Sequence, residues 1–149
     1  MEIIYYVLFI FMITSIDQFT KKAICHYMKK NDLVFIKKRF IKIVIARNYG
    51  AAFGILKNKR LFLKIINGIT IIMISILIFV FNEYVEYKMF VLPLILMLGG
   101  ALGNYIDRIR LGYVVDFIRF NFKRCPIFNL GDIFIFTGSI TLVIFYYFL

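Results

Sequence analysis

Four long apolar segments constrain the fold of this chain more than any other feature of its sequence. They occupy residues 3–16, 61–81, 89–103 and 133–149. A helix needs about 20 apolar residues to cross a bilayer, with a range of roughly 17–25. The second and fourth segments reach this length directly, whereas the first and third reach it only if flanking polar residues join the span. We therefore expect spans at about 3–20, 61–82, 89–107 and 132–149.

The composition also indicates a membrane protein. Hydrophobic residues make up 62% of the 149 residues, and the mean hydropathy is +0.87, whereas a soluble domain contains roughly 45–50% apolar residues. The length fits a single domain, residues 1–149. The net charge of +11 could indicate a nucleic-acid partner in a soluble protein. In a membrane protein anionic headgroups are the nearer partner, so we expect membrane lipids as partners and no nucleic acid.

The connection between the first two spans differs from the rest of the chain in its pattern of apolar and polar residues. Residues 41–45 partly alternate and are rich in β-branched side chains, which favours a strand. Backbone that is neither helical nor part of a closed barrel cannot face lipid tails. We therefore expect a mainly α membrane protein, with four transmembrane helices and a small interfacial β-sheet or cradle at about 33–57. An interfacial loop is expected at 108–131.

Two aspartates lie in stretches that otherwise exclude charge. Asp116 lies in the apolar run 112–118, and Asp132 lies in the run 128–134. A carboxylate beside so much apolar surface loses hydration and gains nothing unless it is paired or used. An ionisable residue at membrane depth is by default a functional hypothesis. Two of them within reach of each other indicate acid/base chemistry.

Other polar residues form clusters that are individually modest. Asp17 and Lys21 are spaced i, i+4 and can pair on one helix face, which alone is more typical of a helix end than of a functional site. Asn48 offers donors and an acceptor, and the neighbouring Gly50 lets backbone approach a ligand closely. Alone, this second cluster could also be an ordinary turn.

The third cluster occupies residues 99–108 and combines small and polar residues. Gly99 and Gly103 form a GxxxG face that permits tight helix packing, which by itself indicates packing and no chemistry. The fourth cluster joins Asn129 to Asp132. Each cluster has a structural interpretation, but the four occur in a fixed order on the four expected spans.

In this order the clusters resemble lipoprotein signal peptidase, the type II signal peptidase of bacteria, from Asp17 to Asp132. The resemblance implies an aspartic endopeptidase with Asp116 and Asp132 as its catalytic pair and no metal or other cofactor. It implies cleavage of diacylglyceryl-modified prolipoproteins just before the lipid-modified cysteine. The expected substrate- and inhibitor-binding residues are Asn48, Gly50, Asn104, Arg108 and Asn129. The expected supporting residues are Asp17, Lys21 and Asp107.

Some details depart from the family or stay open. Tyr49 stands where the family usually has a small residue, Gly131 replaces an alanine, and Ile133 follows the second aspartate where serine is common. Arg108 is either a substrate contact or a partner of Asp107.

The resemblance also implies that the cyclic peptide globomycin occupies the cleft. We expect a monomer, and the sequence leaves open a disulfide between the cysteines at 25 and 125.

The expected orientation conflicts with the distribution of charge. Of the 19 lysines and arginines, only Lys88 lies in the connection between the second and third spans. The positive-inside rule would place the opposite, basic face in the cytoplasm. The family instead has its active site on the extracytoplasmic face of the bacterial inner membrane and both termini in the cytoplasm, and we follow the family.

Two other classes of function remain open at this stage. The first is a small multi-span transporter or channel component in which the aspartates relay protons or cations. Against it, the sequence contains no internal duplication and no paired broken spans. The second is a scaffold in which the glycine-rich face and the ion pairs only pack helices.

Overall fold

The computed structural model describes residues 2–30, 41–50, 59–122 and 125–148. Within these residues, four α-helices, one 3₁₀ helix and three strands follow one another. In order they are α1 (Glu2–Lys30), β1 (Ile41–Asn48), α2 (Arg60–Glu83), η2 (Val85–Phe90), α3 (Val91–Arg110), β2 (Val114–Phe120), β3 (Ile127–Phe128) and α4 (Leu130–Phe148).

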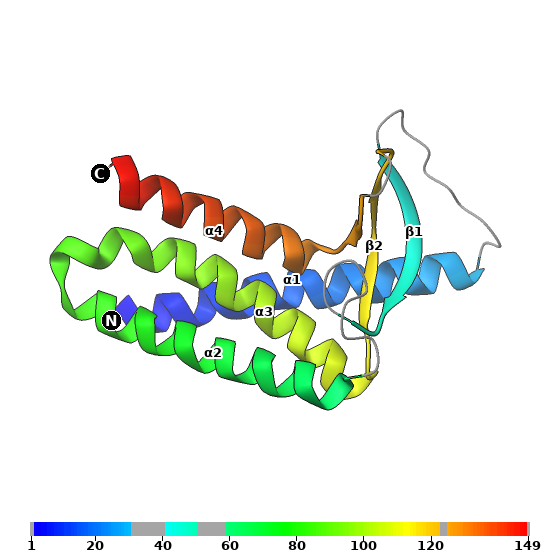
Figure 1. The fold of residues 1–149 in the computed structure, drawn as a ribbon, viewed down its shortest axis with the longest axis horizontal. Coiled ribbons are helices and arrows are strands. Elements are labelled where there is room, and N and C mark those ends of the chain that lie inside the picture. Colours follow the sequence, from blue (N-terminus) through cyan, green and yellow to red (C-terminus); the bar gives the residue numbers. More distant parts are fainter. Residues whose placement is uncertain (1, 31–40, 51–58, 123–124, 149) are drawn as a thin grey trace.

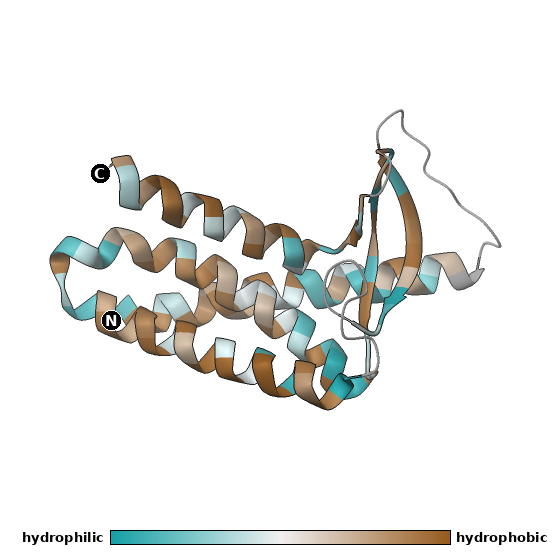
Figure 2. Ribbon diagram, viewed as in Figure 1, coloured by the Kyte–Doolittle hydropathy of each residue, from teal (hydrophilic) through white to brown (hydrophobic). Residues whose placement is uncertain are grey.

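The four α-helices form a bundle, and the sheet stands across one of its ends (Figure 1). All four are long and apolar enough to cross a membrane, which confirms the predicted fold class. Apolar residues cover the helices along most of their length, and polar residues gather toward the ends (Figure 2). Large apolar side chains such as Phe11, Ile72 and Tyr147 are exposed. Lipid is the solvent that such a surface requires.

Helix α3 is the centre of the bundle and packs against α1, α2 and α4. Its glycines allow this close packing. A Cβ atom built on Gly99 would lie 2.6 Å from the Cγ2 atom of Ile13, and one built on Gly103 would meet the carboxylate of Asp17. The GxxxG face therefore packs against α1, as predicted. On another side of α3, Gly100 meets the backbone of Gly131 in α4.

Helix α1 is longer than its predicted span. Its 29 residues correspond to about 43 Å at 1.5 Å per residue, more than the roughly 30 Å of a bilayer core. The helix continues beyond the sheet (Figure 1). Asp17 and Lys21 therefore lie inside a continuous helix and not at its end, which excludes the helix-end interpretation of this pair.

The sheet is antiparallel, with the strand order β1-β2-β3. Strand β1 pairs with β2 from Ile41↔Phe120 to Asn48↔Val114, and the register shifts between Ile43 and Ala46. A sheet was predicted at 33–57, of which 41–48 forms a strand, while 33–40 and 51–57 lie outside the described residues. The prediction of a loop at 108–131 was wrong, because this segment supplies both other strands.

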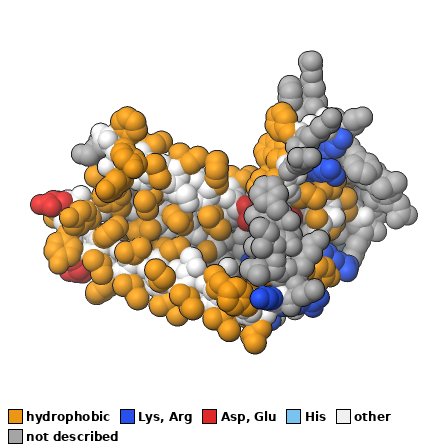
Figure 3. Space-filling view, viewed as in Figure 1, with side chains coloured by type: hydrophobic (Ala, Val, Ile, Leu, Met, Phe, Trp, Pro, Cys, Tyr) orange, Lys and Arg blue, Asp and Glu red, His pale blue; other side chains and the backbone are white. Residues whose placement is uncertain are grey.

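Basic side chains gather at the sheet end of the molecule (Figure 3). At the opposite end the ammonium of Lys88 contacts the carboxylate of Glu2 at 2.8 Å, and the two side chains are 38% and 56% exposed. Both ends of the described chain also lie away from the sheet (Figure 1). The bundle therefore has one basic end that carries the sheet and one end that carries the termini.

The close approach of α1 and α3 yields a stability prediction. Gly99→Ala should lower the thermal unfolding midpoint in detergent, because overpacking typically costs about 1–3 kcal/mol. Gly68→Ala is the matched control, since its Cβ would lie 3.7 Å from the nearest atom, the hydroxyl oxygen of Tyr105. The control should be neutral or stabilising, because alanine favours helix by about 1 kcal/mol over glycine. Equal midpoints for the two variants would contradict the packing argument.

Candidate active site

The site begins with a capping box at the start of α4. The Asn129 side-chain oxygen accepts a hydrogen bond from the backbone N–H of Asp132 at 2.9 Å, and the Asp132 carboxylate accepts one from the backbone N–H of Asn129 at 3.1 Å. This reciprocal arrangement satisfies two N–H groups that a helix leaves unpaired at its N-terminus. The local sequence Asn-Leu-Gly-Asp thus fixes the Asp132 carboxylate in place.

The same asparagine also contacts the other aspartate. The Nδ2 atom of Asn129 donates to Oδ1 of Asp116 at 2.6 Å. Asp116 lies in β2 and is 3% exposed, while Asn129 is fully buried. Asn129 therefore connects the two aspartates that the sequence singled out. Its side-chain N–H donates to Asp116, and its backbone N–H donates to Asp132.

Strand pairing supplies the next donor to Asp116. Because Asp116 pairs with Ala46, Asn48 is its diagonal neighbour on the same face of the sheet. The Nδ2 atom of Asn48 donates to Oδ2 of Asp116 at 3.0 Å, and its Oδ1 atom accepts from the backbone N–H of Gly50 at 3.1 Å. The long-range pairing of β1 with β2 thereby completes the donors to Asp116.

Helix α3 supplies the remaining donor. The Nδ2 atom of Asn104 donates to Oδ1 of Asp132 at 2.8 Å, and its Oδ1 atom accepts from the ammonium of Lys21 at 2.9 Å. Each of the four carboxylate oxygens of Asp116 and Asp132 therefore accepts one N–H hydrogen bond. Donors of this kind stabilise the ionised form of a carboxyl group and oppose the effect of burial.

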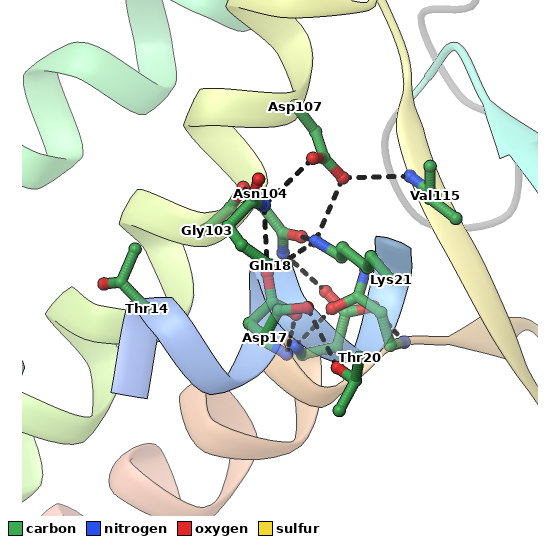
Figure 4. Close-up of polar contacts among 12 residues, drawn as sticks. Thr14, Asp17, Gln18, Thr20, Lys21, Gly103, Asn104, Asp107 and Val115 are labelled. Atoms are coloured by element: carbon green, nitrogen blue, oxygen red, sulfur yellow. Dashed lines mark hydrogen bonds and ion pairs between the residues drawn. The ribbon is translucent and has the colours of Figure 1, made fainter. Parts of the chain in front are cut away.

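A buried ionic cluster lies between α1 and α3 (Figure 4), and Asn104 connects it to Asp132. The ammonium of Lys21 lies 2.7 Å from the Asp17 carboxylate and 3.1 Å from the Asp107 carboxylate. The predicted pair of Asp17 with Lys21 is confirmed, and Asp107 joins it. The backbone N–H groups of Gly131 and Val115 donate to Asp17 and Asp107 respectively. The cluster thus connects α1 to α3, β2 and α4.

The sequence interpretation missed Gln18, the neighbour of Asp17. Its Nε2 atom donates to Oδ1 of Asp107 at 2.9 Å and to the backbone carbonyl of Gly103 at 3.0 Å. It therefore joins α1 to α3 beside the ionic cluster. In the sequence, the only indication of this role was its position directly after Asp17. A glutamine at that position could equally face solvent or another helix.

Arg108 also lies beside the site. Its guanidinium donates to the backbone carbonyls of Gly50 and Asn104, each at 3.4 Å. Among the residues that the structure describes, the ion-pair partner of Asp107 is Lys21 and not Arg108. Arg108 interacts electrostatically with Asp132, Asp116 and Asp107. Contact of Arg108 with a substrate stays a prediction.

Burial is the largest influence on Asp116. Together with the nearby negative charge of Asp132, it raises the pKa of this carboxyl from 3.8 to about 6, against the hydrogen bonds from Asn129 and Asn48. Two carboxyl groups that repel in this way titrate as a pair and share protons. Near neutral pH the pair can therefore both hold and accept a proton, as general acid/base chemistry requires.

Of the three departures from the family pattern, Tyr49 and Gly131 lie at or near the site. The ring of Tyr49 lies 5.3 Å from the ring of Tyr113, with the guanidinium carbon of Arg60 4.6 Å from the Tyr49 centroid. This cation–π contact joins the end of β1 to the start of α2. Gly131 lies in α4, where a Cβ atom would be 2.9 Å from the carbonyl oxygen of Gly100. Ile133 is 39% exposed.

Two further sequence questions concern the cysteines and metal binding. Cys25 and Cys125 do not form a disulfide. Within the described parts of the chain, no three histidine, cysteine or acidic side chains are grouped so that they could hold a metal ion.

Comparison with protein families gives a match over nearly the whole chain. Residues 9–148 match the family model described as Signal peptidase (SPase) II. A lipoprotein signal peptidase of Caldanaerobacter subterraneus is 41% identical over 130 residues, which cover 87% of this chain and 87% of the relative. A lipoprotein signal peptidase of Clostridium tetani is 39% identical over 151 residues, which cover 97% of this chain and 91% of the relative.

The fold also matches two solved structures described as bacterial membrane enzymes. One, determined in meso at 2.3 Å, is 33% identical with a TM-score of 0.74, and the match covers 95% of this chain and 87% of that chain. The other, determined in meso at 1.9 Å, is 32% identical with a TM-score of 0.76, and the match covers 97% of this chain and 93% of that chain.

Proposed function

This chain belongs to the signal peptidase II family and is an aspartic peptidase that removes signal peptides from prolipoproteins, and we propose that Asp116 and Asp132 are its catalytic pair. The observation that carries this proposal is Asn129, which hydrogen-bonds both carboxylates at 2.6 and 3.1 Å. The family match gives no support to a transporter or channel.

The surroundings of the two carboxyls favour a division of labour. Asp132 accepts a backbone N–H at the N-terminus of α4, where the helix dipole stabilises negative charge. It also accepts from Asn104, whose amide is bonded to a cation. Among the described contacts, Asp116 accepts from two neutral side-chain amides. Asp132 is therefore the ionised partner, and Asp116 holds the shared proton.

Hydrolysis follows from this arrangement. Asp132 takes a proton from a water molecule, whose oxygen attacks the scissile carbonyl carbon, while the proton on Asp116 is donated to the carbonyl oxygen. The C–N bond then breaks as its nitrogen takes the proton from Asp132, while a hydroxyl of the tetrahedral intermediate returns a proton to Asp116 and restores the pair. The signal peptide is left with a new carboxyl group and the mature protein with a free amine. None of these proton transfers needs a metal.

The substrate is a diacylglyceryl-modified prolipoprotein, cut just before its lipid-modified cysteine. A lipid-modified substrate with an apolar signal helix partitions into the bilayer, and the exposed apolar faces of the bundle place this enzyme there too. Asn48, Gly50, Asn104, Arg108 and Asn129 lie around the pair, so they are in place to contact the peptide or the lipid glycerol. Globomycin binds the same cleft, and the enzyme acts as a monomer.

The enzyme is a multi-pass membrane protein, and we place it in the bacterial inner membrane. The active site lies at the sheet end, which faces the extracytoplasmic side, and both termini are cytoplasmic. Cleavage needs water. Asp116 lies in β2 and Asp132 in the first turn of α4, where the bundle meets the sheet (Figure 1). The basic residues of this end then contact anionic headgroups of the outer leaflet.

The catalytic assignment is tested with Asp116→Asn and Asp132→Asn. Each variant should insert and unfold cooperatively but lose about 10²-fold or more in kcat/KM on a diacylglyceryl-modified precursor, because acid/base catalysis contributes at least that much. Glu83→Gln is the control, since Glu83 is exposed at the other end of the bundle. Cleavage at the parent rate by both aspartate variants would refute the assignment.

The pH dependence of cleavage should respond to Asn48. The hydrogen bond from Asn48 lowers the pKa of Asp116, which burial holds at about 6. Without this bond the pKa rises, so the pair keeps its shared proton to higher pH. The alkaline limb of kcat/KM for Asn48→Ala should therefore move to higher pH relative to the parent. An unmoved or more acidic limb would contradict the proposed role of Asp116.

Orientation is tested with single cysteines in a background of Cys25→Ser and Cys125→Ser. Arg119→Cys lies on the sheet, and Glu86→Cys lies in η2 at the other end; both native residues are exposed. A membrane-impermeant thiol reagent should label Arg119→Cys in intact spheroplasts and Glu86→Cys only after lysis. The reverse pattern would invert the orientation and would agree with the positive-inside rule.

A further inference from the structure

Lys21 is a buried cation with three acceptors. Its side chain is 3% exposed. Its ammonium lies 2.7 Å from Asp17, 2.9 Å from the Oδ1 atom of Asn104 and 3.1 Å from Asp107. An ammonium group has three N–H donors and no acceptor. Every N–H donor of Lys21 therefore has a partner. Of the two polar side-chain atoms of Asn104, only the oxygen can accept a hydrogen bond from the ammonium.

This chemistry decides how the Asn104 amide is turned. With its Oδ1 atom on the ammonium of Lys21, its Nδ2 atom faces Asp132. A flipped amide would place N–H against N–H at Lys21 and oxygen against oxygen at Asp132. We propose that Lys21 is a positioning residue for peptide hydrolysis, which acts by holding the Asn104 amide with its N–H toward Asp132.

Asn104 differs from the other two asparagines of the site in this respect. The amide of Asn129 is oriented by the backbone N–H of Asp132, and that of Asn48 by the backbone N–H of Gly50. Backbone donors persist whatever the side chains are. Among the described contacts, Asn104 is the one amide of the three whose orientation depends on a replaceable side chain.

Correct orientation matters because Asp132 must stay ionised to activate water. The inference therefore rests on the proposed role of Asp132. Among the described residues, the charged groups that interact with Asp132 come from α1, α3 and β2. They are Lys21 and Asp17 of α1, Arg108 of α3 and Asp116 of β2. A flipped Asn104 would turn an amide oxygen toward the Asp132 carboxylate, and Asp132 would then accept a proton more readily.

The test separates orientation from charge. Lys21→Met alone leaves two buried carboxylates without a cation, which threatens folding. The double variant Lys21→Met/Asp17→Asn removes one positive and one negative charge, so the net charge of the cluster is unchanged. The asparagine introduced at position 17 keeps a side-chain oxygen for the Gly131 N–H, which Asp17 accepts at 2.8 Å. Folding is checked by the thermal midpoint in detergent.

The charge-matched double variant should fold but lose about tenfold in kcat, because an oriented hydrogen bond to a charged group is lost. Its KM should change little. The acid limb of kcat/KM should move to higher pH, since Asp132 is protonated more readily. Gln18→Ala is the control: Gln18 contacts Asp17 and Asp107 in the same cluster, so its loss should lower the midpoint but leave the acid limb in place.

A double-mutant cycle then asks whether Lys21 acts through Asn104. Asn104→Ala should reproduce the loss in kcat and the shift of the acid limb. Adding the Lys21→Met/Asp17→Asn pair to Asn104→Ala should cost less than about twofold more, because the amide that Lys21 orients is already gone.

Two results would overturn the inference. One is an unchanged kcat and acid limb in the charge-matched variant, and the other is a loss that multiplies fully with that of Asn104→Ala. Neither touches the proposed catalytic pair, whose failure would show instead as full activity of Asp132→Asn. The two hypotheses are therefore distinguished by different variants.

Discussion

The cost of burying a carboxylate governs the architecture of this protein. Burial drives a carboxyl group to take up a proton, and only N–H donors or a cation can oppose this. The chain provides one N–H for each oxygen of Asp116 and Asp132. The result is a pair that is neither fully ionised nor fully neutral, and this is the state in which one carboxyl can donate a proton while the other accepts one.

Helix packing and chemistry depend on the same small residues. Gly103 leaves room for the Asp17 carboxylate against α3, and Gly100 and Gly131 bring α3 and α4 together at their backbones. A larger side chain at these positions would separate the helices that carry Lys21, Asn104 and Asp132. The glycine-rich run of α3 thus packs the helices together and also brings the residues of the site close to one another. A pure scaffold would need only the packing.

The sheet connects the two halves of the proposed catalytic pair. Asp116 comes from β2, and Asp132 comes from the first turn of α4, which directly follows β3. Strand β1 brings Asn48 to Asp116 from a remote part of the sequence. Tyr49, unusual for the family, contacts Arg60 at the start of α2. A bulky residue is accommodated there because its ring contacts a cation and another aromatic ring.

The sequence by itself determined the four spans, the pairing of Asp17 with Lys21 and the two aspartates, since hydrophobic length and helical spacing are local properties. It did not reveal strands β2 and β3, because β2 pairs with β1 from a remote part of the chain and β3 has only two residues. It listed Asn48, Asn104 and Asn129 as substrate contacts, but only the tertiary structure showed that each donates to an aspartate. The direction of a side-chain amide depends on what lies on both sides of it, and that is decided only when the helices and strands are packed together.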